Sequence, residues 1–173
     1  MADEDVFYRI VNKVSDGYIR TEADELQYNL HVLLRFDLER ALMRGDLQVS
    51  ELEAAWNDRF SADFGFEVDK PSNGVLQDVH WSVGLFGYFP TYTLGNVYAG
   101  CLYDALREDI QTLDADLARG NTSAATGWLR QKVQVHGGFH EPRQLIAQAA
   151  GKPVTEAPLL AYLQRKFSQL YCL

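Results

Sequence analysis

Apolar residues recur at helical spacing along most of this chain, and this periodicity constrains the fold more than any other feature. The clearest run repeats every three or four positions: Leu26, Leu30, Leu33, Leu34, Leu38, Ala41 and Leu42. Charged residues such as Glu25, Arg35, Glu39 and Arg40 are expected on the other faces of this helix. Gly45 follows as a helix stop.

The other helical segments are separated by glycine, proline and polar residues. The same spacing predicts helices over residues 6–14, 50–64, 91–110, 122–135, 141–151 and 155–170. Ser50 is expected to cap the second of these. Residues 74–90 show no clean period, which indicates an ordered but irregular segment. No segment predicts a strand, so the fold class is all-α, with a single helical domain over residues 1–173.

The charge balance argues against one broad class of partner. The net charge is -8, whereas a nucleic-acid-binding domain shows a basic face. The N-terminus is acidic and no apolar run follows it, so no signal peptide is expected. Without export a disulfide is not expected, and we interpret Cys101 and Cys172 as buried thiols. The expected compartment is the cytosol.

Residues 82–103 contain no charged residue or histidine over 22 positions, which is long enough to cross a membrane. However, this stretch includes Pro90, Asn96, four glycines and four tyrosines, so it is not strongly apolar. A buried helix with a preceding loop is therefore preferred, and no membrane partner is expected.

Three of the four histidines are not expected to form a functional site. His136 and His140 have the spacing of a helical metal pair, but Gly137 and Gly138 between them favour a turn, and no glutamate follows the first histidine. We interpret them as exposed loop residues. His31, inside the long helix, is expected to be partly buried and hydrogen-bonded.

Two short clusters are better candidates for a site. Asp78 and His80 are two apart, so an extended backbone points both to one side, where the carboxylate can orient the imidazole. Arg20 presents a planar fork that suits a carboxylate ligand. The alternative for Arg20 is an ion pair with Glu22 or Asp24 at a helix start.

These two clusters also resemble the signatures of a known family. Residues 19–24 read Ile-Arg-Thr-Glu-Ala-Asp, and residues 74–81 read Gly-Val-Leu-Gln-Asp-Val-His-Trp. They are similar to the I/V-R-x-x-A-D and G-x-x-Q-D-x-H-W motifs of the carboxypeptidase Taq family, in the same order. Residues 87–96 and 28–31 are similar as well. The resemblance covers nearly the whole chain and implies the C-terminal part of a larger all-helical metallopeptidase fold.

The resemblance implies a metal-dependent exopeptidase that removes single residues from peptide C-termini. In the family, zinc is held by His-Glu-x-x-His and by a glutamate of a later motif, both N-terminal to the first signature above. Only 18 residues precede Ile19 here, and none is a histidine. The zinc ligands are therefore expected to be missing, no cofactor is expected on this chain, and the chain alone is expected to be inactive.

The resemblance also suggests roles for individual residues in an intact enzyme. Arg20 is expected to hold the terminal carboxylate, and His80, oriented by Asp78, to donate to the substrate or the developing oxyanion. The supporting catalytic residues are then His80, Tyr88 and Tyr92, and the substrate-binding residues are Arg20, Gln77, Asp78 and Trp81.

A second class of function stays open on this sequence. The chain is interpreted either as part of a carboxypeptidase or as a helical binding or assembly module that does no chemistry. Because residues 82–103 carry no charge, they are expected to pack against a missing N-terminal part or to drive formation of a homodimer.

Overall fold

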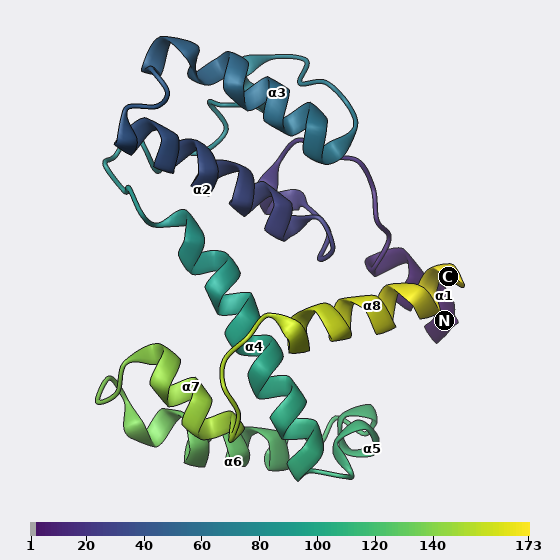
Figure 1. Ribbon diagram of the computed structural model, residues 1–173. Helices are drawn as coiled ribbons and strands as arrows, with labels where there is room; N and C mark the ends of the chain where they lie inside the picture. Colours follow the sequence, from purple (N-terminus) through teal and green to yellow (C-terminus); the bar gives the residue numbers. More distant parts are fainter. Residues whose placement is uncertain (1–2) are drawn as a thin grey trace. The chain divides into compact units, whose positions relative to one another are not determined.

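The computed structural model describes residues 3–173, and every regular element in that range is helical (Figure 1). The α-helices are α1 (Glu4–Val11), α2 (Tyr28–Arg44), α3 (Leu52–Phe64), α4 (Phe89–Asp109), α5 (Leu113–Ala118), α6 (Ser123–Lys132), α7 (Pro142–Ala150) and α8 (Ala157–Tyr171). Short 3-10 turns lie at Arg20–Glu22, Val49–Glu51, Pro71–Asn73 and Gln134–His136. The all-α prediction is confirmed.

The ends of the helices follow glycine positions visible in the sequence. Gly45, Gly65 and Gly151 end α2, α3 and α7 in the left-handed conformation, with φ of 77°, 82° and 67°. The short helix α5 was not predicted. Ser50 does not cap α3: it lies inside a 3-10 turn, and the backbone nitrogen of Gln48 donates to the Glu51 carboxylate at 3.0 Å.

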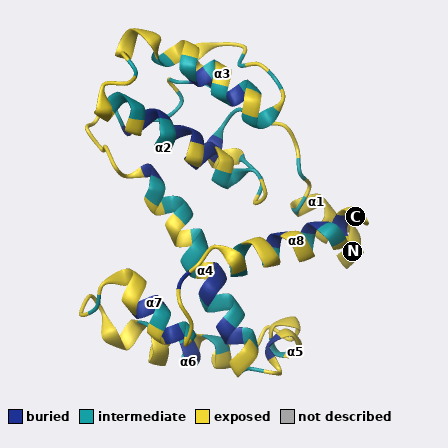
Figure 2. Cartoon of the chain, viewed as in Figure 1, coloured by how far each residue is buried: buried dark blue, intermediate teal, exposed yellow. Residues whose placement is uncertain are grey.

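The chain divides into two compact units, one ending at Thr93 and the other beginning at Leu94, and α4 runs across this boundary. The single domain expected over the whole chain stays a prediction. In the first unit, α2 packs against α3 around a buried cluster of Leu34, Leu38, Trp56 and Phe60. Figure 2 shows buried residues along both of these helices.

Helix α2 does not bury the face that its leucines predicted. Leu34 and Leu38 belong to the core, but Leu30 and Leu33 are 38% and 40% exposed. The buried side chains of α2 instead include Arg35 and Glu39. The face that carries Arg35 and Glu39 is therefore buried, because both side chains have partners in the segment before α4.

The second unit has two adjoining apolar clusters. One joins α4, α5 and α6 through Ala105, Leu106, Leu113 and Trp128, and the other is built on Cys101, Ile146 and Val154. Cys101 is a buried thiol as expected, whereas Cys172 is exposed, contrary to its interpretation as buried. Within residues 3–173, no helix is both long enough and apolar enough to span a bilayer.

Candidate functional site

The two sequence motifs meet in the first unit, and Gln77 joins them. Its side-chain oxygen accepts a hydrogen bond from the backbone nitrogen of Arg20 at 3.0 Å. Its Nε2 donates to the carbonyl oxygens of Tyr18, at 3.0 Å, and of Asn73, at 2.8 Å. One amide therefore ties the 3-10 turn that begins at Arg20 to the segment that carries Asp78.

Asp78 accepts hydrogen bonds from two guanidinium groups. Nη2 of Arg20 lies 2.8 Å from Oδ1, and Nε of Arg35 lies 2.5 Å from Oδ2. Burial alone would raise the pKa of Asp78, but the hydrogen bond from Arg20 and the charge of Arg35 outweigh it, so this pKa lies below its usual value. Burial lowers the pKa of Arg35 to about 10, although Asp78 opposes the shift. The cluster is therefore ionic at neutral pH.

Arg20 is enclosed by its partners and by aromatic rings. Its Nη1 donates to the phenol oxygen of Tyr28 at 3.1 Å, and its guanidinium carbon lies 4.8 Å from the ring centre of Tyr92. The alternative interpretation, an ion pair with Glu22 or Asp24, is wrong: the acid that Arg20 contacts is Asp78. Its Nε is buried and has no hydrogen-bond partner among residues 3–173.

His80 is oriented chiefly by aromatic residues. Its Nε2 lies 3.0 Å from the phenol oxygen of Tyr92, and its ring packs on Phe89 with ring centres 4.4 Å apart. Nδ1 lies 3.7 Å from Asp78 Oδ1, which is too long for a hydrogen bond. The expectation that Asp78 orients His80 directly is therefore corrected: Asp78 is the partner of two arginines.

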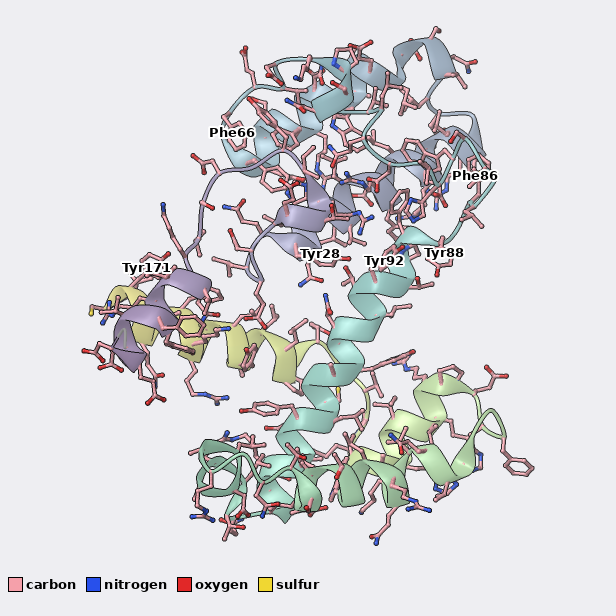
Figure 3. All side chains as sticks on the ribbon, turned by 180° about the vertical axis from the view of Figure 1, so that it is seen from behind. Tyr28, Phe66, Phe86, Tyr88, Tyr92 and Tyr171 are labelled. Carbon is pink, nitrogen blue, oxygen red and sulfur yellow. The ribbon has the colours of Figure 1, made fainter. Side chains whose placement is uncertain are left out.

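Tyr88 completes a group of three donors at the start of α4. Its ring centre lies 5.7 Å from that of His80 and 5.4 Å from that of Tyr92. Figure 3 labels both tyrosines at this end of α4, together with Tyr28 on α2. Tyr88 is 45% exposed, so the group is open to solvent at this point. The structure thus brings together His80, Tyr88 and Tyr92, and their catalytic role stays a prediction.

Trp81 lies behind this group, against the core. Its Nε1 donates to the Glu39 carboxylate at 2.7 Å, and its ring stands edge-on to Trp56 and Phe89. Trp81 therefore supports the site from the core side.

His31 differs from its prediction. It is fully buried against Phe60 and Phe64, and neither ring nitrogen has a hydrogen-bond partner within the described chain. Burial, with the nearby positive charge of Arg35, lowers the pKa of His31 to about 4. The imidazole is therefore neutral at physiological pH, and the expected hydrogen bond is not formed.

No metal site is formed by the residues that the structure describes. In residues 3–173, no three His, Cys, Asp or Glu side chains lie close enough to hold a metal ion. His136 lies exposed at the end of a 3-10 turn and His140 is half-buried a few residues later, with ring centres 5.6 Å apart. The residues present therefore do not fit a zinc ion.

Three residues of the site were missed from the sequence: Tyr28, Arg35 and Glu39. They recur at positions i, i+7 and i+11 of α2, the spacing of one helix face. Polar residues at that spacing indicate a second buried face of the helix. The leucine repeat of the same helix is the stronger pattern, and it predicts a different buried face.

Comparison with known proteins places these features in a family. Residues 1–167 match the model of the carboxypeptidase Taq (M32) metallopeptidases. The chain is 41% identical over 165 residues to thermostable carboxypeptidase 1 of Thermus thermophilus, covering 95% of this chain and 32% of the relative. It is 39% identical over 169 residues to carboxypeptidase 1 of Bacillus subtilis, covering 98% of this chain and 34% of the relative.

Solved structures show the same likeness. The crystal structure of an M32 carboxypeptidase from Deinococcus radiodurans superposes with a TM-score of 0.96 at 43% identity, covering 99% of this chain and 35% of that chain. Trypanosoma cruzi metallocarboxypeptidase 1 gives a TM-score of 0.89 at 36% identity, over 92% of this chain and 34% of that one. The chain thus spans about a third of the length of these relatives.

Proposed function

Because the chain belongs to the carboxypeptidase Taq (M32) metallopeptidase family, we propose that it is the substrate-holding part of a zinc-dependent carboxypeptidase. Such an enzyme releases C-terminal amino acids from peptides. The observation that carries the proposal is the ionic cluster of Arg20, Asp78 and Arg35 beside His80, Tyr88 and Tyr92.

The arginine cluster suits a peptide's terminal carboxylate. Two guanidinium groups share the single carboxylate of Asp78, and Nε of Arg20 and Nη2 of Arg35 have no hydrogen-bond partner among the described residues. Glu39, a buried acid of α2, is engaged with Trp81 and Gly87 instead. A substrate carboxylate would supply the missing acceptor, and a hydrogen bond to a charged group contributes about 1.5–3 kcal/mol.

The donors at the start of α4 suit an oxygen that gains negative charge. The Nε2 of His80 and the phenol of Tyr92 share one hydrogen bond, and the exposed Tyr88 lies beside them. When His80 donates in that bond, the hydroxyl protons of Tyr92 and Tyr88 are left to donate to a developing oxyanion. We assign His80, Tyr88 and Tyr92 this supporting role in the intact enzyme.

Zinc, when bound in a metallopeptidase, activates a water molecule and polarises the scissile carbonyl. No group of residues within 3–173 fits such an ion. Holding a carboxylate strengthens ground-state and transition-state binding alike, so it does not by itself accelerate hydrolysis. We therefore propose that the chain alone binds peptides without cleaving them.

A second function is favoured by a patch of exposed apolar side chains. Val83, Leu85 and Phe86 are 63%, 43% and 48% exposed, just before α4. A helical assembly module that pairs with a second copy, or with an N-terminal part of the family fold, would cover them. Sedimentation velocity of the full chain over a concentration series tests this module: Phe86→Lys should weaken any self-association, and a monomer at every concentration argues against the homodimer.

Calorimetric titration tests the proposed function. An N-acylated dipeptide with a free C-terminal carboxylate should bind the full chain, and the same dipeptide with a C-terminal amide should bind at least tenfold more weakly. Arg20→Lys keeps the charge but loses the planar fork, so it should remove most of this preference. Arg130→Lys, at an exposed position of α6, is the matched control. Equal affinity for both peptides would contradict the proposal.

A further inference from the structure

Glu39 is a buried carboxylate of α2 whose two oxygens hold two points of one loop. Its Oε2 accepts a hydrogen bond from Nε1 of Trp81 at 2.7 Å, and its Oε1 accepts one from the backbone nitrogen of Gly87. The residue is 5% exposed, so these bonds are formed out of water. Charge-assisted hydrogen bonds in such surroundings are among the strongest in proteins.

The loop between the two points is closed on itself by backbone hydrogen bonds. Three backbone hydrogen bonds close it into a turn: Val83 to Val79, Gly84 to Trp81 and Leu85 to His80, at 3.1, 3.1 and 2.8 Å. They hold the turn together but do not connect it to α2. Gly87 has a φ of 78°, a conformation that a glycine adopts without strain.

The two anchored residues are immediate neighbours of the candidate catalytic residues. His80 precedes Trp81, and Tyr88 follows Gly87. The ring of Trp81 also stands edge-on to Phe89, at 5.8 Å between ring centres, and Phe89 in turn packs on His80. A shift of either anchor point would therefore move a member of the donor group.

We propose that Glu39 is a positioning residue, which fixes the loop of residues 81–87 to α2 and so sets where His80 and Tyr88 lie. This assignment rests on the proposed function, because only a peptidase would use His80 and Tyr88 as donors to a substrate. The hydrogen bonds that Glu39 accepts from Trp81 and Gly87 are independent of it.

Both oxygens of Glu39 must accept, which makes one substitution especially informative. In Glu39→Gln the side chain keeps its size but has one acceptor oxygen and one NH₂ group. Either the Trp81 indole or the Gly87 amide then faces another donor. Glu39→Ala removes both acceptors and leaves a small void.

Hydrogen exchange followed by NMR on the full chain tests the anchor. In Glu39→Ala, the Gly87 amide and the Trp81 indole should both exchange at least tenfold faster than in the wild type. In Glu39→Gln, one of the two should do so and the other should be nearly unchanged. Glu53→Gln, at an exposed position of α3, should change neither. Unchanged exchange at both sites in Glu39→Ala, or an equal acceleration of every amide in α2 and α3, would overturn the proposal.

Two further readouts separate positioning from plain structural support. The ¹⁵N resonance of His80 Nε2 should move in Glu39→Ala and in Trp81→Phe, which lacks the indole donor, but not in Glu53→Gln. The free-carboxylate dipeptide should bind Glu39→Gln about three- to tenfold more weakly than the wild type, with Arg20 intact. If Glu39→Ala does not fold, Glu39→Gln and Trp81→Phe carry the test.

The outcomes also distinguish this inference from the proposed function. If the wild type binds neither dipeptide but the exchange pattern is as expected and His80 shifts, the proposed function fails and the anchor stands. If the dipeptide binds wild type and Glu39→Gln equally and His80 does not shift, Glu39 has no positioning role, whatever the exchange data show.

Discussion

Asp78 accepts hydrogen bonds from two guanidinium groups that are almost completely enclosed by protein. Replacing it by asparagine keeps the shape of the side chain but leaves Arg20 and Arg35 without a counter-ion. Removing one partner of a buried ion pair costs about 3–5 kcal/mol, so Asp78→Asn should lower the free energy of unfolding by that amount. Urea denaturation measures this loss of stability.

The control is Asp114→Asn, which removes an exposed partner of Arg107 and should leave the urea midpoint nearly unchanged. Equal effects of the two substitutions would contradict the account.

His31 should make stability depend on pH. Its pKa is lowered by burial to about 4 in the folded protein, below the ordinary value of about 6.5. Between pH 6.5 and pH 4, the unfolded chain therefore binds more protons than the folded protein. The free energy of unfolding falls as the pH is lowered through this range. The loss from this residue reaches about 3 kcal/mol near pH 4.

Denaturation of His31→Leu and wild type between pH 7.5 and pH 4 isolates this contribution. The variant should show a shallower decline, while His136→Leu, at an exposed position, should follow the wild type. Parallel curves for His31→Leu and wild type would show that the buried imidazole is not the cause.

The residues in the two motifs were predictable, but their partners were not. Arg20, His80 and Tyr92 were identified from local spacing and resemblance, and the structure places them together. Arg35 and Glu39 were assigned to faces of the helix away from its leucines, and the spacing alone does not show that such a face is buried. Their partners Asp78 and Trp81 lie 43 and 42 residues further along, and only the folded chain brings them near.

At the scale of elements, helix boundaries followed from glycines and apolar spacing, whereas the buried face of α2 did not. Gly45 and Gly65 act locally, so the sequence shows the helix ends directly. Which face is buried depends on what packs against it. The irregular segment before α4 supplies hydrogen-bond acceptors and donors to that face. The periodicity of α2 itself does not predict these contacts.

Gly100 on α4 predicts a sharp difference between two glycine substitutions. A Cβ at this position would lie 2.9 Å from the backbone nitrogen and Cα of Leu159 in α8, so Gly100→Ala should destabilise the chain by about 1–3 kcal/mol. Gly95→Ala, in the same helix with open space around it, should instead stabilise by up to about 1 kcal/mol. Thermal unfolding of both variants measures the contrast. Equal shifts would mean that α4 and α8 do not approach each other as closely as described.

At the scale of the whole molecule, the chain matches about a third of the length of M32 metallopeptidases, and its described residues include no set that fits a metal. Within residues 3–173, the arginine cluster and the donor group are assembled, but no three potential ligands converge. Family membership and the all-helical fold were predictable because two motifs lie in the right order. Zinc dependence, a cytosolic location and dimerisation stay predictions.

One NMR measurement tests the central claim most directly. The ¹⁵N-labelled full chain is mixed with zinc and an N-acylated dipeptide that has a free C-terminus, and the arginine side chains and any released amino acid are followed in the same sample. The account predicts that the Arg20 Nε signal shifts while the dipeptide remains intact. Release of the C-terminal amino acid that stops when zinc is chelated, or an unmoved Arg20 signal at saturating peptide, would contradict it.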